Sequence, residues 1–187
     1  MSEEISLEEI KKFWPNDAPD VTNVSKYVKK YKKDLIVIKY GGNVLIDRNI
    51  FNSFIQDITI LNKLGLSIVV VHGGGPRIER ELKKGKIQSK FINGLRVTDN
   101  NVINIVEKVL IEFNNDIVNS LNKKGSKAVS INTKINNVIN VIPDKPELGY
   151  VGIPKEINIE VIKNIISQKQ IPIVAPLGLD KDKKTYN

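Results

Sequence analysis

Hydrophobic residues follow two spacings along this chain: short β-branched runs, and longer stretches with apolar positions three or four residues apart. Leu35 to Lys39 and Ser67 to His72 are runs typical of buried strands. Between them, helical spacing predicts an amphipathic helix over residues 49–64, with Gly65 as its closing glycine. Strands that alternate with helices in this way predict an α/β fold with a largely parallel sheet.

The second half of the chain repeats the alternation. Thr98 is placed to cap a long helix that Gly125 ends, with an apolar face running from Val102 to Leu121. Asn158 is placed to cap another helix. The remaining predicted elements are strands over 127–131 and 138–141 joined as a hairpin at 136–137, a Pro/Gly loop over 145–155, a helix over 160–168, a strand over 172–178 and a hairpin tip over 180–184.

Residues 1–33 differ in style from the rest and are interpreted as a helical extension before a domain that covers 34–187. Helices are expected over 7–13 and over 22–31, where apolar and aromatic residues recur at helical spacing. Such an extension packs on its own domain or on a neighbouring subunit.

The composition is that of a soluble globular protein of one or two domains: 187 residues, 41% hydrophobic and 27% charged. With no Cys and one His, the chain has no disulfide framework and no Cys- or His-rich metal site. The first residues are acidic and no apolar run is long enough to cross a bilayer, so we expect a cytoplasmic protein without membrane contact. The net charge of +8 comes from scattered lysines with few aromatic residues, which argues against nucleic-acid binding.

Two of the predicted strands end in glycine clusters, Gly41-Gly42 and Gly73-Gly74-Gly75. Ligands of open α/β sheets bind at the carboxyl ends of the strands, where glycines allow backbone N–H groups close to an anion. Pro76 fits the first position of a helix whose positive N-terminus would favour an anion. Lys39, just before the first cluster, would add a positive charge suited to a phosphoryl group. The alternative is a pair of tight turns and a solvated lysine.

Three further side chains carry candidate chemistry. Arg96 is one of only four arginines in a lysine-rich chain, and its geometry suits a carboxylate. His72 could be a general base, but a histidine that ends a buried strand is more often a packing residue. Arg77 and Arg80 lie on a short charged helix and are expected to be solvated.

Three stretches together resemble the amino-acid kinase family, and within it the acetylglutamate kinases. They are Ile36-Val-Ile-Lys-Tyr-Gly-Gly-Asn43, Val69-Val-Val-His-Gly-Gly-Gly-Pro76 and Phe91-Ile-Asn-Gly-Leu-Arg-Val-Thr-Asp99, and the resemblance covers residues 34–187. The glycine loops indicate the wider family, whereas Asn-Gly-Leu-Arg-Val-Thr is specific to acetylglutamate kinases and argues against glutamate 5-kinase.

The resemblance implies a three-layer sandwich with a mainly parallel sheet, and transfer of phosphate from ATP with Mg²⁺ to the side-chain carboxylate of N-acetyl-L-glutamate in arginine biosynthesis. It also implies residue roles. Lys39 would stabilise the transferring phosphoryl group and Arg96 would bind the α-carboxylate. Gly41 and Gly42 would bind ATP phosphates, while Gly74, Gly75 and Asn187 would contact N-acetyl-L-glutamate.

Members of the family are longer, and this chain stops where their nucleotide-binding half begins. We therefore expect the acetylglutamate-binding half, with weak or no kinase activity alone. The alternative is a non-catalytic acetylglutamate-binding or oligomerisation module. The resemblance further implies a homo-oligomer, either a dimer, which we place near Val102 to Leu121, or a hexamer formed through the N-terminal helix.

Overall fold

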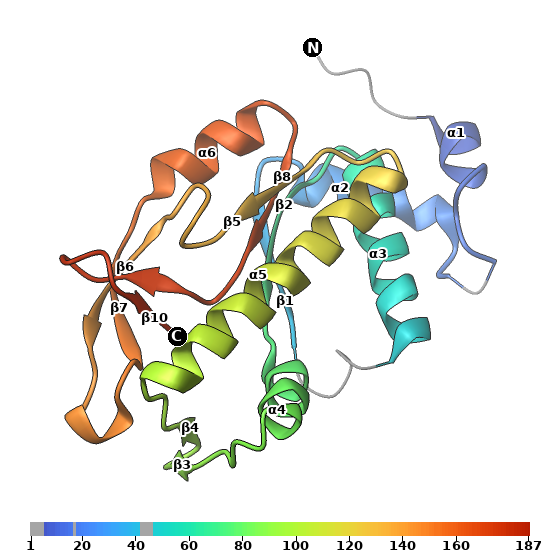
Figure 1. Ribbon diagram of the computed structural model, residues 1–187. Helices are drawn as coiled ribbons and strands as arrows, with labels where there is room; N and C mark the ends of the chain where they lie inside the picture. Colours follow the sequence, from blue (N-terminus) through green and yellow to red (C-terminus); the bar gives the residue numbers. More distant parts are fainter. Residues whose placement is uncertain (1–5, 17, 42–46) are drawn as a thin grey trace.

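The computed structural model describes residues 6–16, 18–41 and 47–187, and a four-stranded sheet lies at its centre (Figure 1). Its strand order is β1-β2-β8-β5, and every pairing between neighbours is parallel. The predicted α/β fold with a parallel sheet is confirmed. The four strands are β1 (Leu35–Tyr40), β2 (Ser67–His72), β8 (Ile171–Val174) and β5 (Ala128–Ile131).

Helices cover both faces of this sheet, which gives three layers (Figure 1). On one face, α3 (Arg48–Lys63) and α5 (Asn100–Lys123) bury apolar side chains against β2 and β8. On the other face, α6 (Ile159–Ser167) places Ile165 against Val69 and Val174. The long apolar face of α5 is therefore buried inside its own chain.

Asp99, and not Thr98, caps α5. Its carboxylate accepts hydrogen bonds from the backbone N–H groups of Asn101 and Val102, both at 2.9 Å. Thr98 is fully buried and its hydroxyl donates to the Arg96 carbonyl at 3.0 Å. The prediction of a Thr98 cap was wrong by one residue, because both side chains are good caps and only their neighbours decide between them.

The hairpin predicted at residues 136–137 is also wrong. β5 belongs to the parallel sheet, whereas β6 (Ile139–Pro143) belongs to a second sheet of order β10-β9-β6-β7. The Asn132 side chain accepts from the N–H groups of Lys134 and Ile135, and this turn directs the chain away from the first sheet. The other strands of the second sheet are β7 (Gly152–Ile157), β9 (Gly178–Leu179) and β10 (Thr185–Tyr186).

The predicted loop over 145–155 contains regular structure, a short 3-10 helix η3 (Pro146–Leu148) and the start of β7. The predicted hairpin tip over 180–184 does connect two antiparallel strands, β9 and β10. Asn158 occupies the N-cap position of α6, but its side chain makes no capping hydrogen bond.

The first strand is less buried than its β-branched sequence predicts. Within the described part of the chain β1 pairs only with β2, and α6 covers the neighbouring strands. Leu35 and Val37 are consequently exposed, Val37 to 62%. An apolar run indicates that a strand is suited to burial, but it does not indicate which strand lies at the edge of the sheet.

Two short helices and a 3-10 turn precede β1: α1 (Leu7–Lys11), η1 (Val21–Asn23) and α2 (Val24–Tyr31). Ser6 and Glu9 form a capping box at the start of α1. Ile10 and Val24 are buried in the same core cluster as residues of α3. The segment before residue 34 thus packs on the rest of its own chain.

α4 (Gly75–Lys84) packs on the first turns of α5 through Ile78 and Leu82. A two-stranded hairpin, β3 (Phe91–Ile92) with β4 (Leu95–Arg96), follows α4 near the same end of α5 (Figure 1). This end of the molecule gathers the residues that the sequence marks for chemistry.

Candidate functional site

The two glycine loops lie next to each other at the carboxyl ends of β1 and β2. The strands are in register, with Tyr40 opposite His72, and the Gly73 N–H donates to the Tyr40 carbonyl at 2.7 Å. A Cβ placed on Gly41 would lie 3.9 Å from the Gly73 nitrogen. Gly42 lies outside the described residues. The parallel pairing therefore brings Gly41 and the triple-glycine loop to one place, the usual ligand position of an open α/β sheet.

Gly74 is the N-cap of α4 and Gly75 its first residue, and the two differ in the space available for a side chain. A Cβ on Gly74 would lie 2.4 Å from Cδ2 of Leu110, so the close approach of α4 to α5 depends on a glycine there. Gly75 is exposed, and a Cβ there would contact nothing within 4 Å. Pro76 occupies the second helical position, one residue later than predicted. The first N–H groups of α4 have no carbonyl partner in the helix and can face an anion.

Lys39 and Tyr40 point to opposite faces of β1, as successive strand residues must. Tyr40 is buried and stacks on Phe54 of α3, with ring centroids 3.9 Å apart. Lys39 is exposed and lies on the opposite face from α3. Its ammonium group is thus accessible at the strand end that leads into the first glycine loop.

Arg96 is the most strongly held of the candidate side chains. Only 10% of its side chain is exposed. Its Nη1 lies 3.1 Å from Oε2 of Glu79 and also donates to the Ser89 hydroxyl, while its guanidinium lies 4.7 Å from the centre of the Phe91 ring. Hydrogen bonds from Ser89 and Arg96 hold the pKa of the Glu79 carboxyl below its usual value.

Asn187 lies beside the segment that follows Arg96. The Tyr150 N–H donates to the Thr98 carbonyl at 2.7 Å, and the Asn187 N–H donates to the Tyr150 carbonyl at 3.1 Å. Oδ1 of Asn187 is buried, and within the described residues it has no hydrogen-bond partner. An acceptor in that position is suited to a donor from a ligand.

His72 is a buried packing residue, as its place at the end of a strand indicated. Its Nδ1 donates to the Gly73 carbonyl at 2.8 Å, and its Nε2 accepts from the Asn114 amide at 3.1 Å. Burial lowers its pKa to about 4, and the Arg77 charge contributes in the same direction, while the bond to Gly73 opposes the shift. A neutral imidazole therefore fixes the first peptide of the triple-glycine loop.

The sequence analysis missed Asn114, which organises this buried polar network. Asn114 is fully buried, and its amide also donates to the Ile173 carbonyl at 2.8 Å, while its Oδ1 accepts from the Ser130 hydroxyl. The signal was available, since Asn114 occurs four residues after Leu110 on the otherwise apolar face of the helix. An amide on such a face indicates a buried hydrogen-bond network.

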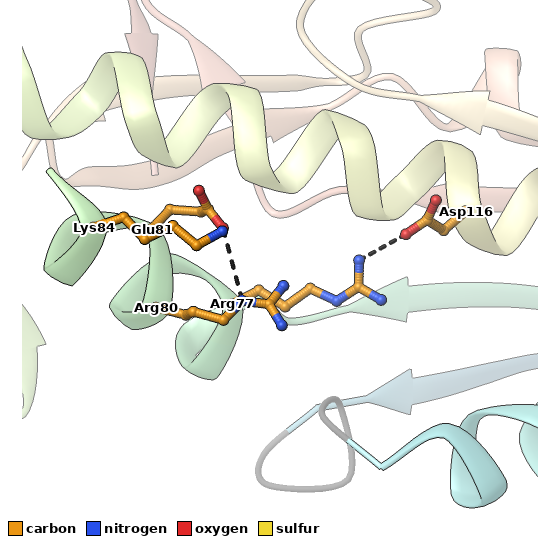
Figure 2. Close-up of polar contacts among 5 residues, drawn as sticks. All are labelled: Arg77, Arg80, Glu81, Lys84 and Asp116. Carbon is orange, nitrogen blue, oxygen red and sulfur yellow. Dashed lines mark hydrogen bonds and ion pairs between the residues drawn. The ribbon is translucent and has the colours of Figure 1, made fainter.

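The expectation that Arg77 is solvated was wrong. Figure 2 shows its guanidinium reaching Asp116 of α5, with Nη1 and Oδ2 2.6 Å apart. The same group lies 3.9 Å from the centre of the Phe113 ring. Arg80 is solvated as expected, with 61% of its side chain exposed. Helix α5 lies close enough to α4 for Arg77 to reach Asp116, and the sequence of α4 alone cannot show this contact.

No three His, Cys, Asp or Glu side chains among the described residues are grouped so that they could hold a metal ion. None of the helices found in that part of the chain is long and apolar enough to cross a membrane.

Comparison with known proteins identifies the family. Residues 34–187 match the amino acid kinase family. The chain belongs to this family. It is 50% identical over 180 residues to the acetylglutamate kinase of Pelagibacter ubique, a match that covers 96% of this chain and 62% of that protein. It is 44% identical over 164 residues to the acetylglutamate kinase of Caldanaerobacter subterraneus, covering 86% of this chain and 55% of the relative.

Two solved structures share the fold of this chain. The crystal structure of smu.665 from Streptococcus mutans has a TM-score of 0.70 and 32% identity, covering 82% of this chain and 63% of that one. N-acetylglutamate synthase from Neisseria gonorrhoeae, solved with coenzyme A and N-acetyl-glutamate, has a TM-score of 0.76 at 20% identity, covering 89% of this chain and 39% of that one. At that identity the second likeness concerns the fold alone. This member of the family spans between about half and two thirds of the length of its curated relatives.

Proposed function

We propose that this chain provides the N-acetyl-L-glutamate site of an acetylglutamate kinase, which transfers the γ-phosphoryl group of ATP to the substrate's side-chain carboxylate. The same proposal places the reaction in cytoplasmic arginine biosynthesis. The observation that carries it is the largely covered Arg96 beside α4, whose N-terminus forms the second glycine loop. The names of relatives up to 50% identical support it.

The proposed roles follow from charge and position. N-acetyl-L-glutamate carries two carboxylates, of which Arg96 would bind the α-carboxylate in a bidentate manner. The N–H groups at Gly74 and Gly75, and the amide of Asn187, would hold the remaining polar groups. Binding both ends of a small dicarboxylate fixes its orientation, which lowers the entropic part of the barrier.

The reaction needs no general base, since the nucleophile is a carboxylate oxygen that is ionised at neutral pH. That oxygen forms a bond to the γ-phosphorus of ATP while the bond from this phosphorus to the bridging oxygen of ADP breaks. ADP leaves with the electron pair and no proton is transferred. Lys39 would neutralise charge on the transferring group, and Gly41 and Gly42 would approach the phosphates of ATP.

Magnesium would enter with ATP as part of the substrate complex. Phosphate oxygens are its preferred ligands in such complexes, with few protein groups required. Lys39 and the backbone N–H groups of the first glycine loop would then contact the phosphates, while phosphate oxygens and water would bind the ion. Within this proposal we also expect a homo-oligomer.

The test is calorimetric titration of the chain with N-acetyl-L-glutamate, with L-glutamate as the control ligand. We expect binding that requires the acetyl group, and at least about 30-fold weaker affinity in Arg96→Ala, since a hydrogen-bonded charge pair is lost. Arg80→Ala, which removes a solvated arginine from the neighbouring helix, is the matched control and should bind as the parent does.

Two results would contradict the proposal. Absence of binding by a chain whose circular dichroism shows it folded would mean that the site is not formed here, and would favour an oligomerisation module. Equal binding of N-acetyl-L-glutamate and L-glutamate would mean that a different amino acid is the ligand. If binding is seen, an assay for ADP release with MgATP shows whether this chain alone also supports phosphoryl transfer.

A further inference from the structure

The guanidinium of Arg96 is held from one edge only. Both hydrogens of its Nη1 have partners, Oε2 of Glu79 at 3.1 Å and the hydroxyl of Ser89. Within the described residues, no hydrogen bond or ion pair involves its Nε or Nη2. An arginine has five donors in a rigid plane, so the Nε–Nη2 edge remains available for a carboxylate.

The two partners of Nη1 also bind each other. The Ser89 hydroxyl donates to Oε2 of Glu79 at 2.6 Å, which closes a three-membered cluster of Glu79, Ser89 and Arg96. The guanidinium carbon lies over the Phe91 ring, 4.7 Å from the ring centre. The hydroxyl of Thr98 fixes the backbone by donating to the Arg96 carbonyl. Rotation of the guanidinium is therefore opposed by the hydrogen bonds at one edge and by the contact with Phe91.

These contacts come from separate parts of the chain. Glu79 lies on α4, which begins at Gly75, Ser89 lies in the following loop, and Arg96 lies in β4. The cluster thus ties the orientation of Arg96 to the helix whose N-terminus forms the second glycine loop. A ligand that contacts both Arg96 and the second glycine loop would find these two groups at a set separation.

We propose that Glu79 and Ser89 are positioning residues, which hold Arg96 so that its Nε–Nη2 edge faces the α-carboxylate of the substrate. This inference rests on the proposed function. Its effect is preorganisation, because a guanidinium that is already oriented loses less conformational freedom when a ligand binds. The competing possibility is that the Glu79 carboxylate occupies Arg96 in place of the substrate, in which case its removal would strengthen binding.

The experiment compares Glu79→Ala with Glu81→Ala. Both glutamates lie on α4 and pair with cations, but Glu81 pairs with Lys84 and Arg80 and not with Arg96 (Figure 2). We expect Glu79→Ala to bind N-acetyl-L-glutamate about three- to tenfold more weakly, the cost of ordering one long side chain. Glu81→Ala should bind as the parent does. Glu79→Gln keeps an acceptor for Ser89 and Arg96 and should recover most of the loss.

A ligand analogue separates positioning from a general structural effect. N-acetyl-glutamate whose α-carboxylate is replaced by an amide cannot form the charged pair with Arg96. For this analogue, the difference between the parent and Glu79→Ala should disappear. An equal loss for both ligands, no loss at all, or tighter binding in Glu79→Ala would overturn the proposal.

A second measurement decides the inference if the parent does not bind N-acetyl-L-glutamate, which would count against the proposed function. The chain has four arginines, so the side-chain Nε–H signals can be resolved by ¹⁵N NMR, and the loss of one signal in Arg96→Lys assigns it. We expect the Arg96 signal to broaden in Glu79→Ala and to remain sharp in Glu81→Ala. An unchanged signal in Glu79→Ala would show that Glu79 does not orient Arg96.

Discussion

At the scale of single residues, the neutral His72 links the stability of the protein to pH. Its pKa is about 4 in the folded chain and near 6.5 when unfolded, mainly because burial disfavours the charged imidazole. Between these values the unfolded chain binds a proton that the folded chain does not. Stability contributed by the neutral ring is therefore complete above the unfolded pKa and is lost as the pH falls toward about 4.

We expect the free energy of unfolding to fall by about 2 kcal/mol between pH 7 and pH 5 from this group. Urea unfolding at the two pH values measures the change. The assignment is direct because His72 is the only histidine. His72→Asn keeps an amide donor toward Gly73 and removes the titration, so its stability should change much less over this interval. The same pH dependence in the variant would show that another group is responsible.

The sequence was most informative about the candidate site at this scale of single residues. Lys39, Gly41 and the triple-glycine loop could be selected because glycine clusters after apolar runs have few structural explanations. Arg96 could be selected because arginine is rare here. Glu79 and Ser89 could not, since the chain has many charged and polar residues and nothing local marks those that bind Arg96.

At the scale of elements, the helix ends show what capping contributes. Asp99 caps α5 with two hydrogen bonds, whereas Asn158 at the corresponding position of α6 makes none. We expect Asp99→Ala to reduce the free energy of unfolding by about 1 kcal/mol, and Asn158→Ala by a few tenths at most. Chemical denaturation of the two variants beside the parent makes the comparison. Equal losses would contradict the assignment of the cap to Asp99.

Another element-scale feature is a cavity of about 330 Å³ at the amino ends of the strands, lined by Lys29, Lys32, Lys63 and Lys169. The C-terminal ends of α2, α3 and α6 meet there, and these lysines lie in or just after their last turns. Helix C-termini carry partial negative charge, which lysines offset. The helix ends account for this cluster of lysines without a ligand.

At the scale of the whole molecule, the exposed face of β1 is the least covered part of the sheet. Within the described residues β1 has one neighbour, and its Val37 is 62% exposed. Unpaired strand edges with apolar side chains promote association between chains. We therefore expect the 187-residue chain to self-associate as its concentration rises, as measured by sedimentation velocity.

Val37→Lys should reduce this association, because a charged residue at a sheet edge opposes pairing with another strand. Ile159→Lys is the control. Ile159 is also exposed, to 53%, but it lies in α6 and not in a strand. A chain that is monomeric at all concentrations, or one that responds equally to both substitutions, would show that the β1 edge is not the contact.

Local structure and candidate chemistry could be predicted from the amino-acid sequence. Period-2 and period-3.6 patterns depend on neighbours a few residues away, so β2 was predicted with its observed bounds and α3 and α5 with nearly theirs. The glycine clusters and Arg96 stood out for similar reasons, since composition and local context sufficed. From these elements the α/β class followed.

Which elements become neighbours depended on how the chain packs. The separation of β5 from β6, the exposure of β1, the pairing of Arg77 with Asp116 and the cluster around Arg96 all join residues that are distant in sequence or depend on what covers a strand. Such contacts form where packing brings side chains together, and many sequences with the same local pattern would pack differently. The residues of the candidate site could therefore be selected from the sequence, whereas the side chains that they contact depend on the fold.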